Sequence, residues 1–148
     1  MSPKYSLVEI ERRWFVDTTK LPSLEGESFS DIEDRYILAT RTRLRKVVTP
    51  GKEPIYKLCK KYGTTGPFTE PITNIYLTPT EHGVYASLGA RVVTKRRYRI
   101  AGGVLDVFTD GTDPRFEVEF ASLEEASSYQ PPEFVTEELV TSSCMSST

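Results

Sequence analysis

The stretch VEIERRWFV, residues 8–16, decides the fold class that the sequence predicts. Successive side chains of an extended strand point to opposite faces, so Glu9, Glu11 and Arg13 share one face. The opposite face is apolar apart from Arg12 and holds Val8, Ile10, Trp14 and Val16. The segment therefore predicts a strand with one charged face and one apolar face.

The same division of charged and apolar positions recurs in most of the later strand-like segments. The charged faces hold Arg43 and Arg45 in 36–47, Lys57 and Lys61 in 55–62, Lys95 and Arg97 in 91–100, Asp106 in 104–108, and Glu117 and Glu119 in 115–120. Segments 8–16 and 115–120 carry acidic pairs, whereas 36–47, 55–62 and 91–100 carry basic sets. Residues 18–31, rich in Pro, Gly and Ser, predict a loop.

Two architectures fit this alternation. An antiparallel sheet packed on helices would leave its charged face in water. A closed barrel would instead enclose the charged face and pack its apolar face under helices. Enclosed charges must pair, stay hydrated or hold a charged ligand, because burying them alone is prohibitive.

The signs of the charges indicate a class of ligand for the closed form. Carboxylates two residues apart on a strand lie about 7 Å from each other, close enough to share a hydrated divalent cation. Arginine forks and lysine ammonium groups suit phosphate oxygens. A hole that contains both sets is suited to a complex of a metal ion with a polyphosphate.

The overall composition is that of an ordinary globular chain. The 148 residues are 38% hydrophobic and 27% charged with a net charge of −2, which predicts one domain and no general attraction to nucleic acid or anionic membranes. No apolar run approaches the length of about 20 residues that a membrane span needs, and no secretory signal is visible, so we expect a cytoplasmic protein. His82, the single histidine, has no partner for zinc binding or Ser/His/Asp catalysis.

Two short helices and a tail complete the predicted organisation. Thr78 and Glu81 have capping-box spacing and predict a helix over 79–88, and Ser122 with Glu125 predicts a second helix. Residues 1–140 form the predicted domain, and the Ser/Thr-rich residues 141–148 are predicted to be disordered. Cys59 and Cys144 are expected to be free thiols.

Several motifs, in order along the chain, resemble those of the CYTH family, the triphosphate tunnel metalloenzymes. VEIERRWFV resembles the family's ExExK signature, and PPEFVTEELV resembles its lead into an EVT motif, which aligns Glu138 with the family's glutamate. The remaining matches are TRLR (42–45), KLCKK (57–61), KRRY (95–98), LDVF (105–108) and EVEF (117–120).

The resemblance implies an α+β, mainly β fold: an eight-stranded antiparallel closed β-barrel forming a tunnel, with a few short helices packed outside. It implies Mg²⁺ or Mn²⁺ as the cofactor, a small-molecule triphosphate as the partner, and a monomer or homodimer. Residues implied to hold metal are Glu9, Glu11, Glu117, Glu119, Asp106 and Glu138, and those implied to bind triphosphate are Arg43, Arg45, Lys61, Lys95 and Arg97. Glu9, Glu11 and Arg13 are the implied catalytic set, whereas Lys57, Arg41, Arg91 and Arg99 match no family position and are expected to be structural.

The leading functional hypothesis is metal-dependent hydrolysis of inorganic tripolyphosphate to diphosphate and phosphate. Adenylate cyclase, thiamine triphosphatase and nucleoside triphosphatase activities of the same fold remain alternatives, as does a non-catalytic polyphosphate-binding module. An oligonucleotide-binding barrel ranks lowest, because Tyr56, Tyr62 and Tyr98 have the parity opposite to the basic sets.

Three departures from the family pattern bear on these expectations. Arg13 replaces the signature lysine and stays protonated, so any proton handled by that lysine must be handled differently here. Cys59 replaces a threonine. The sequence ends soon after the EVT-like position, where relatives continue into a helix; this weakens the assignment of Glu138 and leaves open whether that end of the tunnel is closed.

Overall fold

The structure, a computed structural model, describes residues 2–139. The predicted tail and Cys144 lie outside the described residues. The strands are β1 (Leu7–Val16), β2 (Phe29–Ile37), β3 (Thr42–Val48), β4 (Ile55–Lys61), β5 (Thr69–Leu77), β6 (Ala90–Ile100), β7 (Gly103–Phe108), β8 (Arg115–Glu119) and β9 (Val135–Leu139). The helices are a 3₁₀ turn (Thr18–Lys20), α1 (Pro79–Tyr85) and α2 (Leu123–Ser128).

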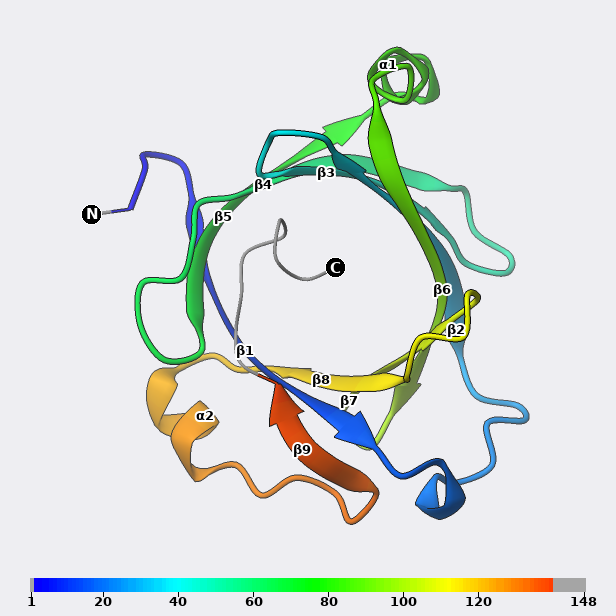
Figure 1. The fold of residues 1–148 in the computed structure, drawn as a ribbon, viewed down its shortest axis with the longest axis vertical. Helices are drawn as coiled ribbons and strands as arrows, with labels where there is room; N and C mark the ends of the chain where they lie inside the picture. The colour runs from blue at the N-terminus through cyan, green and yellow to red at the C-terminus, as the bar shows by residue number, and fades with distance from the viewer. Residues whose placement is uncertain (1, 140–148) are drawn as a thin grey trace.

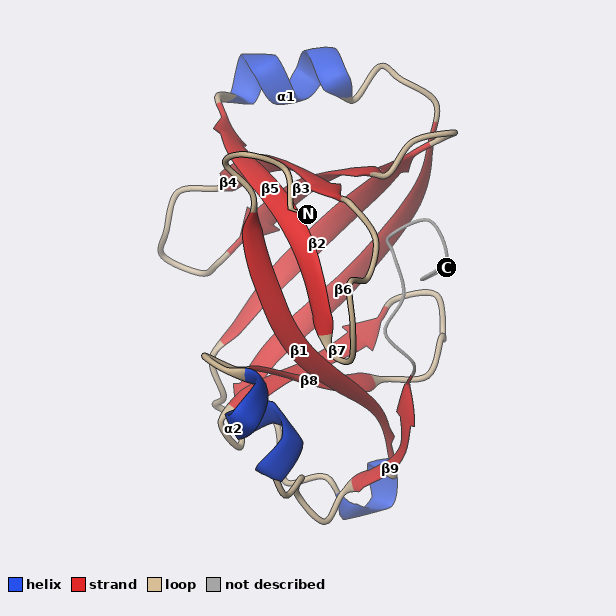
Figure 2. Cartoon of the chain, turned by 90° about the vertical axis from the view of Figure 1, so that its left-hand side faces the viewer, coloured by secondary structure: helices blue, strands red, loops and turns tan. Residues whose placement is uncertain are grey.

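Eight of the strands close into an antiparallel barrel (Figures 1 and 2), which confirms the predicted fold class. Around the ring the order is β1, β5, β4, β3, β2, β6, β7, β8 and back to β1. Closure gives every strand of the ring two neighbours, so the sheet's backbone groups pair around the whole circumference.

Strand β1 closes the ring and also pairs with a strand outside it. Residues 7–10 pair with β5, and residues 11–15 pair with β8. Residues 13–16 also pair with β9, along the same edge of β1 that pairs with β5. The strand that begins the chain is therefore held by three segments that come much later in the sequence.

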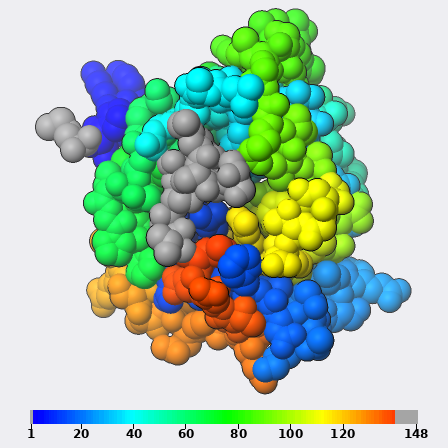
Figure 3. Space-filling model, viewed as in Figure 1, coloured from blue at the N-terminus to red at the C-terminus, as the bar shows by residue number. Residues whose placement is uncertain are grey.

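The hydrophobic core lies outside the barrel wall, as the parity of the apolar positions predicts. Trp14, Leu105 and Phe116 are buried there, and Phe134 packs edge-on against Phe116 at 5.1 Å between ring centroids. Residues of the 17–28 segment and the segment that follows α2 cover this cluster. In the space-filling view α2 and β9 lie along the lower side of the molecule, while α1 stands out at the upper rim (Figure 3).

The main error in the predicted secondary structure concerns the bounds of strand β2. Residues 29–31 were expected in a loop and 36–47 in one strand, but β2 spans Phe29–Ile37 and a turn separates it from β3. Ala39 takes a positive φ of 61° in this turn, which contains no glycine or proline to mark it in the sequence. The inward face of β2 mixes Ile32 with Asp34, so its alternation carries no clear signal.

The predicted helix starts are confirmed, and one helix is shorter than expected. Thr78 and Glu81 form a reciprocal capping box, but α1 ends at Tyr85 and not at residue 88. Leu88 donates its backbone N–H to the carbonyl of Tyr85, so the last residues form a tighter turn. Among residues 2–139, no helix is long and apolar enough to cross a membrane.

The turn between β6 and β7 sets the register of these two strands. Ala101 and Gly102 both have positive φ, as a two-residue hairpin loop of this kind requires. Gly103 already belongs to β7, where an added Cβ would lie 2.4 Å from the carbonyl oxygen of Glu117. Only glycine therefore allows β7 to approach β8 this closely.

Candidate functional site

The barrel encloses a polar cavity of about 150 Å³. It is lined by side chains from one parity of each strand, so the charged faces point inward. Its charged lining residues are Glu9, Glu11, Arg13, Arg43, Arg45, Lys57, Lys61, Lys95, Arg97, Asp106, Arg115, Glu117 and Glu119. Of the residues predicted for the site, all except Glu138 are therefore brought together.

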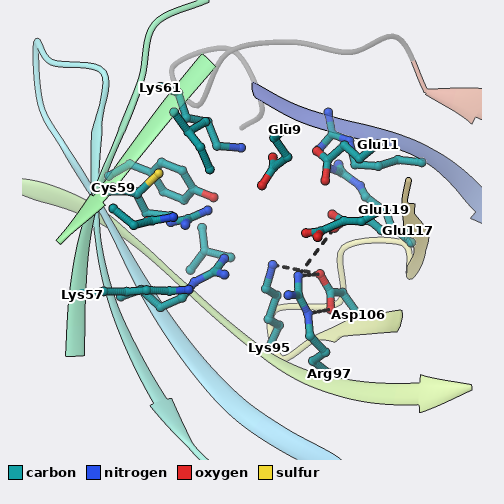
Figure 4. A pocket seen from close by; sticks show the side chains of 18 of the residues that line it. Glu9, Glu11, Lys57, Cys59, Lys61, Lys95, Arg97, Asp106, Glu117 and Glu119 are labelled. Atoms are coloured by element: carbon teal, nitrogen blue, oxygen red, sulfur yellow. Dashed lines mark hydrogen bonds and ion pairs between the residues drawn. The ribbon is translucent and has the colours of Figure 1, made fainter. Parts of the chain in front are cut away.

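The glutamates form an acidic wall on neighbouring strands β1 and β8 (Figure 4). Glu11 stands opposite Glu119 in the strand register, and Glu117 stands opposite Arg13. Glu9, Glu11 and Glu119 each offer a carboxylate oxygen within 4.8 Å of the others. This convergence of oxygen donors fits a hard divalent cation such as Mg²⁺ or Mn²⁺.

The protonation of the acidic wall reflects this crowding. Burial, together with the charges of Glu117 and Glu9, raises the pKa of Glu11 to about 8. Burial and the same kind of repulsion, from Glu9 and Glu117, raise the pKa of Glu119. For Glu117 burial is more than offset by the charges of Arg97, Lys95 and Arg13 together, so its pKa is lowered. The wall thus has more negative charge than its surroundings neutralise, which a bound cation would correct.

Most of the remaining charged lining is a basic wall from β3, β4 and β6, which meets the acidic wall where Arg97 Nη2 lies 3.6 Å from Glu117 Oε2 (Figure 4). It contains the five residues predicted to bind triphosphate, Arg43, Arg45, Lys61, Lys95 and Arg97. Lys57, expected to be structural, also lines the cavity, and burial with the nearby charges of Arg45 and Arg43 lowers its pKa. Its parity, shared with Lys61, was the signal that could have placed it there.

Arg115 is a second lining residue that the motifs did not identify. It lies at the start of β8 with the same parity as Glu117. Its guanidinium carbon lies 5.5 Å from the ring centroid of Phe108 and 5.9 Å from that of Phe15. Its buried Nε has no hydrogen-bond partner among the described residues. Arg115 therefore adds a donor at the end of the acidic wall.

Asp106 lines the cavity, where two basic residues contact both of its oxygens. Its carboxylate accepts two hydrogen bonds from the Arg97 guanidinium, at 2.7 and 2.9 Å, and pairs with Lys95 Nζ at 2.8 Å. Burial opposes ionisation, but Lys95 and Arg97 hold the pKa of Asp106 well below its ordinary value. Both oxygens thus hold the basic wall in place, and the role of Asp106 as a metal ligand stays a prediction.

Asp34, on the strand that the sequence did not reveal, plays the corresponding part on the other side of Lys95. It is fully buried and accepts two hydrogen bonds from Arg45, at 2.7 and 2.9 Å. Arg43 and Lys95 lie 3.8 and 3.9 Å from its oxygens. No clear sequence pattern pointed to Asp34, because it lies directly before Arg35 and Tyr36 in a strand of mixed polarity.

The assignment of Glu138 to the metal site is wrong. Glu138 lies on β9, outside the ring, and both of its oxygens accept hydrogen bonds from Arg12, at 2.8 and 2.7 Å. Arg12 has the outward parity of β1 and stacks over Trp14. The pair ties β9 to the outer side of β1, and neither residue lines the cavity.

Arg13 occupies the position of the signature lysine and faces the cavity beside the acidic wall. Its charge lowers the pKa values of Glu11 and Glu117, although other effects dominate at both carboxyls. Since a guanidinium does not release its proton in proteins, Arg13 supplies charge and donors and no proton.

Comparison with known proteins finds similar solved structures but no matching family model or curated protein. Two crystal structures of NE1496 do match, one described as a hypothetical protein and the other as an inorganic triphosphatase. Each is 25% identical with a TM-score of 0.51, covering 89% of this chain and 89% or 86% of its own. The likeness confirms at the level of the fold the resemblance seen in the motifs.

Proposed function

We propose that this protein is a metal-dependent triphosphatase that hydrolyses inorganic tripolyphosphate to diphosphate and phosphate. The observation that carries the proposal is the pair of opposed walls in one enclosed cavity. Four glutamates face a set of lysines and arginines across a space suited to a chain of phosphates. The similar structure described as an inorganic triphosphatase supports the same reaction class.

The residues fit Mg²⁺ or Mn²⁺ by both geometry and charge. Glu9, Glu11 and Glu119 would hold the ion, and Glu117 stands next to them on β8. When bound, such ions neutralise phosphate charge and lower the pKa of a coordinated water, which makes it a nucleophile near neutral pH. The raised pKa of Glu11 implies that this carboxyl gives up a proton when a cation binds.

The chain's own contribution is positioning and charge stabilisation. In hydrolysis the water oxygen bonds to the terminal phosphorus, the bridging P–O bond breaks, and negative charge moves onto the departing diphosphate. Lys95 and Arg97, held by Asp106, and Arg45, held by Asp34, present fixed donors to that charge. No histidine or serine nucleophile is needed, because phosphoryl transfer depends mainly on positioning and electrostatics.

The test is phosphate release from tripolyphosphate, ATP and thiamine triphosphate with Mg²⁺, Mn²⁺ or EDTA. We expect turnover of tripolyphosphate that requires metal and falls by at least about a hundredfold in Glu9→Gln/Glu11→Gln. Glu138→Gln is the matched control, because it removes a glutamate that pairs with Arg12 outside the cavity. It should keep wild-type turnover.

Other outcomes would replace the proposal with a named alternative. Cyclic AMP and diphosphate from ATP would indicate a cyclase of the same fold. Binding of tripolyphosphate without turnover, under every metal condition, would indicate a capture module. Equal loss of activity in Glu138→Gln and in the double variant would contradict the assignment of the acidic wall.

A further inference from the structure

Asp34 is a fully buried carboxylate to which the motifs give no role. It lies on β2 directly opposite Arg45 of β3 in the strand register. Arg45 donates Nε–H to one of its oxygens and Nη2–H to the other, which is the two-point fork typical of arginine–carboxylate pairs. A guanidinium has five N–H donors, so this fork leaves the remaining donors of Arg45 for the cavity that it lines.

A second aspartate repeats this arrangement. Asp106 of β7 stands opposite Arg97 of β6 and holds it through the same Nε and Nη2 atoms. Lys95 lies between the two carboxylates, 2.8 Å from Asp106 and 3.9 Å from Asp34. Two register-matched forks that share one lysine therefore fix the orientation of the basic wall.

The surroundings of Asp34 show that its charge is matched to the wall. Arg43, Arg45 and Lys95 are all more than nine-tenths buried, and all three approach its oxygens. Although burial opposes ionisation, Arg45 holds the pKa of Asp34 well below its ordinary value, with help from Arg43 and Lys95. Without this carboxylate the three cations would repel one another, and Arg45 would lose the contact that sets its rotamer.

We propose that Asp34 is a positioning residue for the triphosphate site, which fixes Arg45 and thereby aims its free donors at the substrate. The inference rests on the proposed function and deepens it. The proposal separates binding from turnover. Removing the carboxylate adds one net positive charge to the wall, which favours any phosphate anion, but it loosens the donor that must meet the charge developing on the leaving group.

Asp34→Asn tests this with a control of the same kind on the same strand. Asp31 makes the same fork with Arg96, at 2.8 and 3.1 Å, on the outer surface of the barrel, so Asp31→Asn is the matched control. Calorimetric titration of tripolyphosphate in EDTA gives Kd, and phosphate release with Mg²⁺ or Mn²⁺ gives kcat and KM.

For Asp34→Asn we expect a Kd equal to or lower than that of the wild type, with kcat lower by at least about tenfold. Asp31→Asn should change neither. Unchanged kcat in Asp34→Asn would overturn the inference. So would a parallel weakening of binding and turnover, because that is the effect of a general structural role. A wild type without binding or turnover would overturn the proposed function, and this inference with it.

A second variant keeps the test decisive if Asp34→Asn does not fold. Asp34→Asn/Arg45→Gln removes the carboxylate together with its arginine, so no unpaired partner of the fork stays buried. If Asp34 acts through Arg45, the double variant should have the kcat of Arg45→Gln alone. A further drop in kcat beyond that of Arg45→Gln would show that Asp34 acts by another route and would overturn the inference.

Discussion

Replacing Glu11 with glutamine should make the metal-free protein more stable at alkaline pH. In the folded chain burial and the neighbouring glutamates raise the pKa of Glu11 from 4.5 to about 8. The folded state therefore keeps a proton that the unfolded chain loses near pH 4.5. Since the unfolded state binds fewer protons between these values, stability is lost as the pH rises through the folded pKa. Glutamine does not titrate and so avoids this loss.

The magnitude follows from the difference between the two pKa values. Each unit corresponds to about 1.4 kcal/mol, so the full effect above the folded pKa is about 5 kcal/mol. Because water and salt reach the cavity and screen the repulsion, we expect about 2–3 kcal/mol at pH 8. For a chain of this length that corresponds to a rise in Tm of about 5–10 °C. Near pH 4.5 the two proteins should differ little.

The assay is thermal and urea unfolding of wild type and Glu11→Gln from pH 5 to 9 in EDTA, repeated with Mg²⁺. Glu53→Gln, in the exposed β3–β4 turn, controls for the loss of one surface charge. Mg²⁺ should reverse the order, because it stabilises the wild type more than the variant. Equal pH dependence of both proteins in EDTA would refute the reasoning that the acidic wall is short of positive charge.

Four further substitutions test other parts of the structure. Glu138→Gln should lower the free energy of unfolding by about 1 kcal/mol, through the partly buried pair with Arg12, and leave the Mg²⁺ response intact; a lost Mg²⁺ response would return Glu138 to the metal site. Phe116→Ala should cost about 3–5 kcal/mol in urea unfolding, because the ring is fully buried, and a cost below about 1 kcal/mol would contradict this packing. Gly103→Ala should destabilise by more than about 1 kcal/mol, since the added Cβ meets a backbone carbonyl of β8, and wild-type Tm would show that β7 and β8 lie farther apart. Arg45→Lys should weaken tripolyphosphate binding by about tenfold in calorimetry, because a point charge replaces a fork, and an unchanged Kd would exclude Arg45 from substrate contact.

The sequence was most informative where one face of a strand is mainly apolar and the other is charged. In β1 the inward and outward parities are separated except at Arg12, because the outer face packs on the core and the inner face lines the cavity. The capping box of α1 is equally local, since Thr78 and Glu81 satisfy each other's backbone partners within one turn. Such features depend on few neighbours and can be predicted from pattern alone.

The remaining features depend on contacts that no local pattern records. Strand β2 mixes apolar and charged residues on its inner face because Asp34 is neutralised by a neighbouring strand. Asp106 has the carboxylate of a possible metal ligand, but in this structure its oxygens contact Lys95 and Arg97. Glu138 matched a motif position, but β9 pairs outside the ring. In each case the partner, and not the residue type, decides the role.

The three pairings of β1 have a consequence for the order in which the protein folds. This first strand carries half of the acidic wall, but its partners β5, β8 and β9 come from the middle and the end of the chain. Pairings of such high sequence separation form slowly, because a long loop must close before any contact rewards it. During synthesis β1 emerges before β5, β8 and β9, so its set of partners is complete only after β9 has emerged. We therefore expect the acidic wall to be completed late in folding, when the barrel closes.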